Sequence, residues 1–219
     1  MGIAAMAALT LVSCSSDDLD SFSDNSSKNE AISFDGYLGR SAVAVNGSRG
    51  SVLDKDALQN STEGFGVFGN YSYTDEKGFG SNLFNNQPVT YSSKDKTWTY
   101  TPLKYWSTQG HIDFLAYAPY EDGKTLTGSK INFTVADQVD NQNDLLWANV
   151  KDQTKTNNPV KFTFNHALAK IGYAVKKGVT DDNVTITLNK ITLAGSATDP
   201  AVGAFYTDGT IDLSKDLSK

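Results

Sequence analysis

The sequence predicts an all-β fold, an antiparallel β-sandwich, and two observations carry this prediction. Short stretches in which apolar and polar residues alternate recur from Ala31 onward, separated by clusters of Gly, Asn and Asp. Helical signals are scarce, and the chain shows neither an internal repeat nor the strand–helix alternation of a parallel sheet. With 219 residues, 39% of them hydrophobic, the chain is long enough to bury such a core.

The predicted elements follow one another closely along the chain. The first strands are expected around Ile32 and Phe34 and around Val43 and Val45, and a Gly/Asn-rich stretch precedes Pro88. Further strands are predicted at residues 65–68, 71–73, 98–100, 111–117, 131–135, 160–164, 171–175, 184–188 and 191–193. The nearly continuous apolar run at 111–117 indicates a strand covered on both faces.

Two short helices are also predicted, one within Ser51–Gln59 and one within Asp144–Asn149. In the second, Asp144 is the expected N-cap of the apolar run that follows it.

Composition excludes several classes of function. The net charge of −6 and the lack of a basic run argue against nucleic acid or anionic lipid headgroups as partners. The single cysteine excludes an internal disulfide framework. Because His111 and His166 are the only histidines, little material exists for a transition-metal site, and neither metal nor cofactor is expected. Both are interpreted as hydrogen-bonded structural residues, with a pH switch or a catalytic role as the alternative.

Motifs that would indicate an enzyme or a bound ion are incomplete. The triplet beginning at Gly123 resembles the end of a phosphate loop but lacks its upstream Gly. Asp140, Gln142 and Asp144 have the 1-3-5 spacing of a calcium loop without its Gly and Glu, so a solvated capping loop is the preferred interpretation. No pair of carboxylates is placed in an apolar cleft, and no enzymatic activity is predicted.

The N-terminus predicts a lipoprotein signal peptide over residues 1–13. The stretch is too short for a membrane-spanning helix, which needs roughly 20 residues, but it suits the apolar region of a secretory signal. It lacks the positively charged start, so the true start is expected upstream. Leu11-Val12-Ser13-Cys14 resembles the bacterial lipobox, which implies cleavage before Cys14 and acylation of that residue; an ordinary buried cysteine is the alternative.

Residues 14–30 are predicted to be a flexible acidic tether. Ser15-Ser16-Asp17-Asp18-Leu19-Asp20 resembles the export signal of Bacteroidetes surface lipoproteins, which implies transfer to the outer face of the outer membrane. A solvated acidic linker is the alternative. Residues 31–200 are assigned to one β-sandwich. Residues 201–219 are assigned to the start of an incomplete C-terminal region, because no strand pattern follows Ile211.

Five motifs between residues 31 and 195 resemble the fimbrillin family of Bacteroidetes, the subunits of type V pili. They are F-x-V-F at 65–68, W-x-Y-x-P-x-x-Y-W at 98–106, a strand ending in A-Y-x-P at 112–119, Q-x-D-L-L-x-A at 142–148 and F-x-F-x-H-x-L-A-K at 162–170. The resemblance implies two transthyretin-like β-sandwiches. This chain would carry the N-terminal one, and residues 201–219 would be the start of a truncated C-terminal one.

The resemblance also implies a mode of assembly. Such subunits travel as surface lipoproteins whose first strand completes their own sheet, until an Arg- or Lys-specific protease cuts the loop after it. Arg49, in the loop Asn46-Gly47-Ser48-Arg49-Gly50, is the expected processing site, and Arg40 is the competing one. The residues expected to plug the groove are Ile32, Phe34, Val43 and Val45. Their removal would expose a strand edge that a donor strand fills. Anchor-type relatives keep their lipid and are not cut, which is the alternative.

The predicted function is therefore a structural and adhesive surface lipoprotein, a fimbrillin-like pilus subunit or anchor assembling by protease-triggered donor-strand exchange. The expected partners are other fimbrial subunits, the outer membrane through lipidated Cys14, an arginine-specific protease and a host or bacterial surface ligand. The expected location is the outer membrane surface, and the fimbrium after processing. The alternative is a glycan-binding surface lipoprotein of a polysaccharide-uptake system, which exposed aromatic residues such as Trp106 would favour.

Overall fold

The computed structural model describes residues 30–38, 53–74, 78–156, 158–169, 174–178, 180, 183–191 and 207–216. The helical elements among these residues are α1 (Lys55–Asn60) and the 3-10 turn η2 (Val139–Asn141). The strands are β1 (Phe34–Leu38), β2 (Phe65–Ser72), β3 (Phe84–Ser92), β4 (Thr97–Thr99), β5 (His111–Ala118), β6 (Lys130–Thr134), β7 (Leu146–Gln153), β8 (Val160–His166) and β9 (Asp208–Asp212). The predicted all-β fold is confirmed.

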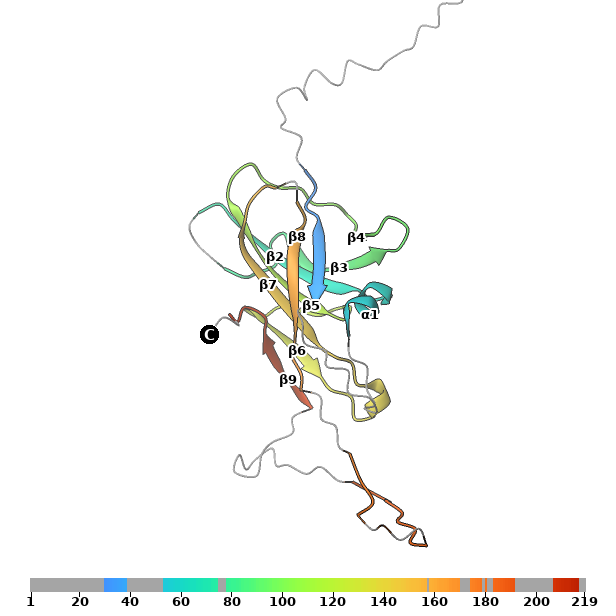
Figure 1. The fold of residues 1–219 in the computed structure, drawn as a ribbon. Helices are drawn as coiled ribbons and strands as arrows, with labels where there is room; N and C mark the ends of the chain where they lie inside the picture. Colours follow the sequence, from blue (N-terminus) through green and yellow to red (C-terminus); the bar gives the residue numbers. More distant parts are fainter. Residues whose placement is uncertain are drawn as a thin grey trace, which may run out of the picture.

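Seven strands form one sheet in the order β1-β8-β7-β5-β2-β3-β4, and β6 pairs with β9 in a second, two-stranded sheet (Figure 1). Neighbours in both sheets run antiparallel, except that β1 runs parallel to β8. The two edge strands of the large sheet, β1 and β4, contact each other. The sheet therefore curls around its core far enough to bring its ends together.

The main core is aromatic and lies inside this curled sheet. Its centre is formed by side chains from β1, β2, β3, β5 and β8, namely Phe34, Phe65, Phe84, Phe114 and Phe162, all at most 2% exposed. These rings meet mostly edge-to-face, at centroid distances from 5.4 to 6.3 Å. Such pairs add about 0.5–1.5 kcal/mol each beyond their buried area.

A second core lies on the other face of the sheet, beneath β6 and β9. Its buried members are Phe68, Leu115, Tyr117, Ile131, Trp147 and Leu213. β5 supplies alternate side chains to the two cores, with Phe114 in the first and Leu115 in the second. The prediction that this strand is covered on both faces is therefore confirmed. Asp208–Asp212, beyond the boundary expected at residue 200, is the strand that pairs with β6.

The short helix predicted within Ser51–Gln59 is confirmed for its described part. α1 begins after Asp54, whose Oδ1 accepts a hydrogen bond of 2.7 Å from the N–H of Ala57. This is the N-cap contact that Asp is suited to make.

The helix predicted within Asp144–Asn149 is wrong, because these residues begin β7. Leu146, Trp147 and Ala148 are buried in succession, which a strand covered on both faces achieves as well as a helix does.

No strand was predicted over β3, because two features break its alternation of buried and exposed residues. Asn86 has a left-handed φ of 49°, and the pairing with β2 shifts register between Val67 and Gly69.

The strand predicted at 184–188 does not form. Residues 184–191 belong to no strand or helix, and Val184, Ile186 and Leu188 are exposed. Figure 1 shows this part of the chain, in orange, extending away from both sheets. Residues 171–173 and 192–193 of the neighbouring predicted strands lie outside the described residues.

Candidate functional site

Residues 30–38 occupy a slot whose two sides come from different parts of the chain. The first half pairs with the segment after β4, because Ile32 N–H donates to the Lys104 carbonyl at 2.8 Å and Trp106 N–H donates to the Glu30 carbonyl at 3.0 Å. The second half is β1, which pairs with β8 from Phe34 opposite Val160 to Leu38 opposite Phe164. The segment thus changes its partner at Ser33, whose carbonyl accepts from Val160 N–H at 2.8 Å.

Phe34 is the apolar anchor of this segment. Its ring lies 5.4 Å from Phe84, 5.5 Å from Phe114 and 5.6 Å from Phe162, centroid to centroid. Ile32, two residues earlier, is also buried, whereas Tyr37 is 52% exposed. The alternation of the strand therefore sends one face into the main core and leaves the other in solvent.

Gly36 allows β1 to approach the opposite wall of the core closely. A Cβ atom at this position would lie 3.4 Å from Cε2 of Phe164 and 3.6 Å from the rings of Phe65 and Trp98. A glycine inside a strand often marks such an approach. Sequence reasoning did not include Gly36 in the site, although an isolated glycine after two alternating apolar residues was the available signal.

Tyr100 holds the first half of the segment through its hydroxyl. The O–H donates to the Ile32 carbonyl at 2.7 Å, and the oxygen accepts from Lys104 N–H at 3.2 Å. Burial raises the pKa of Tyr100, because the phenolate would lose its hydration. The hydroxyl therefore stays protonated, and able to donate, at neutral pH.

Two of the predicted site residues lie in the described part of the chain. Ile32 and Phe34 lie together in the slot, where their expected role as a plug remains a prediction. Val43, Val45, Arg40, Arg49 and Cys14 lie outside the described residues.

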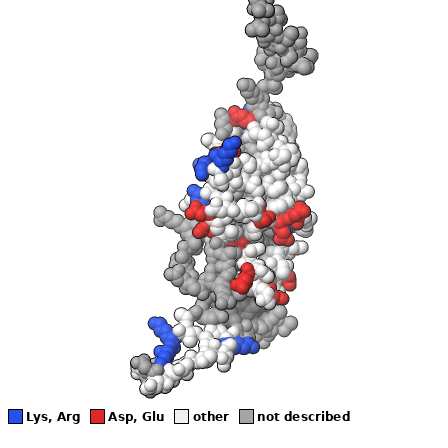
Figure 2. All heavy atoms as spheres, turned by 90° about the vertical axis from the view of Figure 1, so that its right-hand side faces the viewer, with Lys and Arg blue, Asp and Glu red and all other residues white. Residues whose placement is uncertain are grey.

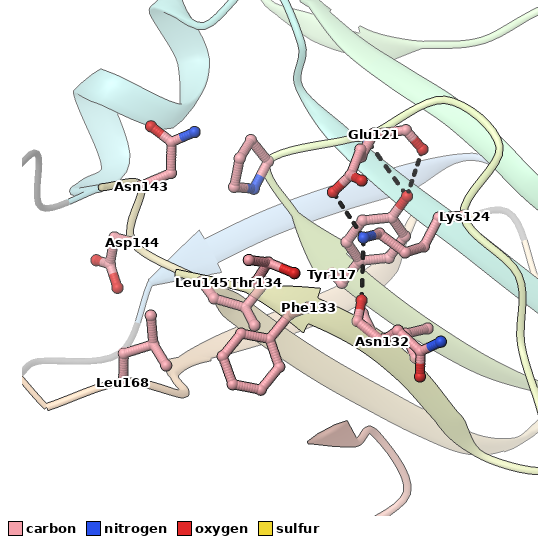
Figure 3. Close-up of a pocket in the computed structure, with 12 residues that line it drawn as sticks. Tyr117, Glu121, Lys124, Asn132, Phe133, Thr134, Asn143, Asp144, Leu145 and Leu168 are labelled. Carbon is pink, nitrogen blue, oxygen red and sulfur yellow. Dashed lines mark hydrogen bonds and ion pairs between the residues drawn. The ribbon is translucent and has the colours of Figure 1, made fainter. Parts of the chain in front are cut away.

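A small polar pocket lies between the end of β5 and β6 (Figure 3). Lys124 Nζ reaches across it, forming an ion pair with Glu121 at 2.6 Å and donating to the Asn132 carbonyl at 3.0 Å. The Tyr117 hydroxyl donates to Asn86 Oδ1 at 2.6 Å, and burial raises the pKa of Tyr117. These groups form hydrogen bonds or an ion pair with one another, so we assign the pocket a structural role.

The acidic loop beside this pocket also has structural contacts. Asp144 Oδ2 lies 2.7 Å from Nδ1 of His166 and accepts from Leu53 N–H at 3.1 Å. The Gln142 side chain donates to the Ala136 carbonyl at 2.9 Å. His166 is thus hydrogen-bonded, as expected. In His111, which was expected to be hydrogen-bonded as well, Nε2 is buried without a hydrogen-bond partner among the described residues.

The three tryptophans do not form a stacking surface. Trp98, Trp106 and Trp147 are 5%, 2% and 7% exposed, so Trp106 is not the exposed aromatic that glycan binding would need. Figure 2 shows Asp and Glu side chains in small separate groups over one face of the body. None of the helices formed by the described residues has the length and apolar composition that a bilayer span requires.

Comparison with known proteins identifies a family. A family model described as "Fimbrillin-like" matches residues 52–217, three quarters of the chain. A search of curated proteins finds no significant match. The matched range runs from just before α1 to just after β9, and β1 precedes it.

Proposed function

Because this chain belongs to the fimbrillin-like family of pilus structural subunits, we propose that it joins other subunits by strand exchange at the slot that residues 30–38 fill. The observation that carries the proposal is that β1, an edge strand, places the Phe34 ring among the rings of the main core. An edge strand can leave without unthreading the sheet. Its departure would expose both the β8 edge and an apolar groove, which is the template for another chain's strand.

We further propose that proteolysis triggers this departure. β1 ends at Leu38 and α1 begins at Lys55, so in the sequence both Arg40 and Arg49 follow β1 and precede α1 and all later strands. A cut at either arginine would separate β1 covalently from α1 and all later strands. The sequence Asn46-Gly47-Ser48-Arg49-Gly50 makes Arg49 the preferred site.

The N-terminal part fits a membrane anchor that precedes assembly. Acylation of Cys14 would hold the chain at the outer membrane, and residues 14–30 would separate the lipid from β1. Two or more acyl chains anchor stably, whereas one binds only marginally. Cleavage at Arg49 would release lipid, tether and β1 together, and an uncut chain would remain an anchor subunit.

The test begins with digestion of the non-lipidated chain by an arginine-specific protease. Mass spectrometry of the parent, Arg49→Lys and Arg40→Lys chains identifies the bond that is cut. We expect Arg49→Lys to prevent release of the N-terminal fragment and Arg40→Lys to permit it. Cutting that depends on Arg40 would move the processing site, and resistance at both would contradict processing.

The second stage tests strand exchange on the cut protein. A fluorescent peptide of residues 30–38 should bind after the native fragment is removed. A Phe34→Asp peptide should bind at least 100-fold more weakly, because its carboxylate would enter an aromatic groove. A Tyr37→Asp peptide is the matched control, since Tyr37 faces solvent. Equal binding of all three peptides, or binding of none, would contradict exchange at this slot.

A further inference from the structure

A cluster of metal-ligating side chains lies where β5 begins and β7 ends. His111, Asp113 and Asp152 each offer a ligand atom, and these atoms all lie within 4.8 Å of one another. His111 Nε2 is 3.9 Å from Asp152 Oδ1. The cluster belongs to the large sheet but not to the slot filled by residues 30–38.

The strand geometry brings the three residues together. His111 and Asp113 are two residues apart on β5 and therefore point to the same face. The pairing of β5 with β7 shifts register between Ile112 and Phe114, and Asp152 has a left-handed φ of 54°. In this irregularity Asp152 N–H donates to Asp113 Oδ1 at 2.7 Å, which places the two carboxylates side by side.

One of these groups lacks the hydrogen-bond partner that burial demands, and a second has a hydrogen bond but no cationic partner among the described residues. His111 Nε2 is buried and accepts or donates no hydrogen bond among the described residues. Asp113 is only 3% exposed, and no described lysine or arginine lies within 4.0 Å of its carboxylate. Burying an ionised carboxylate costs several kcal/mol unless a cation or hydrogen bonds compensate for the lost hydration. A cation bound between the three side chains would give His111 Nε2 a partner and would balance the buried charge of the Asp113 carboxylate.

We propose that His111 Nε2, the Asp113 carboxylate and Asp152 Oδ1 bind a divalent transition-metal ion of the Zn²⁺ class. An imidazole ligand favours Zn²⁺ over the hard cations Ca²⁺ and Mg²⁺, which take oxygen ligands. Ligands bound at about 2.1 Å in a tetrahedral site lie roughly 3.4 Å apart, so a closure of about 0.5 Å brings Nε2 and Oδ1 into range. The Asp152 side chain, which supplies Oδ1, is half-exposed.

Sequence reasoning did not expect a metal because it counted only two histidines. The spacing His111-x-Asp113 supplies two ligands, but the third comes from a residue 39 positions after Asp113, and only the pairing of β5 with β7 places it nearby. Three protein ligands leave room for water or for a side chain of another molecule as the fourth. The ion would connect the first residues of β5 to the last residues of β7.

The test measures binding of Zn²⁺ alone to the metal-free chain by calorimetry. All proteins carry Cys14→Ser, so that the thiol contributes no ligand. We expect one saturable Zn²⁺ site, a rise of the unfolding temperature with Zn²⁺ but not with Ca²⁺ or Mg²⁺, and a shift of the His111 ring nitrogen signals in NMR. Asp152→Asn and His111→Gln should each weaken binding at least 30-fold.

The controls distinguish this site from nonspecific binding of Zn²⁺ to acidic residues. Asp122→Asn removes an exposed carboxylate from another loop and should bind Zn²⁺ like the parent. Asp152 is half-exposed, so its substitution tests the site without the folding risk of changing buried Asp113. The proposal is overturned if no saturable site is found, or if Asp152→Asn and His111→Gln bind as tightly as Asp122→Asn does.

Discussion

Gly64 and Gly123 both have left-handed backbones, with φ of 64° and 70°, but their surroundings differ. A Cβ at Gly64 would lie 2.0 Å from the Val89 carbonyl oxygen of β3, whereas nothing lies within 4 Å of a Cβ at Gly123. The conformation alone costs a non-glycine residue about 1–2 kcal/mol. Gly64 therefore has a second requirement, the close approach of two backbones where β2 begins.

We predict that Gly123→Ala lowers the free energy of unfolding by about 1 kcal/mol, the cost of backbone strain alone. Gly64→Ala should lower it by clearly more, because the clash with Val89 forces β2 and β3 apart. Urea denaturation of the two variants and the parent measures both losses. Equal losses would show that the approach to Val89 relaxes without cost.

At the scale of elements, β9 is held at its end by Asp212. The carboxylate accepts hydrogen bonds from Ser129 Oγ at 2.7 Å, from Ser214 N–H at 3.0 Å and from Ser214 Oγ at 2.7 Å. The Ser129 hydrogen bond is the main reason that the pKa of Asp212 lies below its usual 3.8. These contacts join the turn before β6 to the turn after β9.

A lowered pKa fixes the sign of a pH dependence. The ionised carboxylate stabilises the fold fully above the pKa of the unfolded chain, near 3.8, and this contribution disappears as pH falls through the lower pKa of the folded chain. We predict that Asp212→Asn lowers the melting temperature at pH 7, and that the difference from the parent narrows below pH 4. A difference that stays constant between pH 7 and pH 2.5 would contradict this role.

Several elements could be predicted from alternation alone, and their exceptions have physical reasons. β8 is the clearest case, because it buries alternate residues. β5 was predicted instead from a nearly continuous apolar run, which fits its burial on both faces. β7 was assigned to a helix because a four-residue apolar run has no measurable period. The parallel pairing of β1 with β8 depends on contacts between residues more than 120 positions apart, which local patterns do not record.

Of the candidate slot, only the segment that fills it was predicted from the sequence. Ile32 and Phe34 were recognised from their alternation, but the walls that receive them were not. Tyr100 appeared in the sequence as part of a motif, and nothing there indicated that its hydroxyl would meet the Ile32 carbonyl. A receptor assembled from β3, β5 and β8 follows from the topology, so it becomes visible only once the strands are placed.

At the scale of the whole molecule, two cores share β5 as a common wall. Phe114 faces the first core and Leu115 faces the second, so a displacement of β5 disturbs both. The second core is closed by Leu213, which follows β9 and is fully buried. We therefore treat the body formed by β1–β9 as one cooperative unit.

We predict that Leu213→Ala and Phe34→Ala each lower the free energy of unfolding, by about 2–5 and 3–5 kcal/mol. Because the cores share β5, each variant should still unfold in a single transition when followed by tryptophan fluorescence and by far-UV circular dichroism. Tyr37→Ala, on the exposed face of β1, is the control and should change stability little. Two separate transitions in either core variant would show that the cores unfold independently.

The direction of β1 has a consequence for any assembly built on it. A strand that replaced β1 residue for residue would have to run parallel to β8 to place its side chains in the same positions. The strand that one subunit donates and the groove that receives it in the next are different surfaces, so a chain of such contacts would be of the head-to-tail kind. A fibre built from such contacts is polar: its base and its growing end differ.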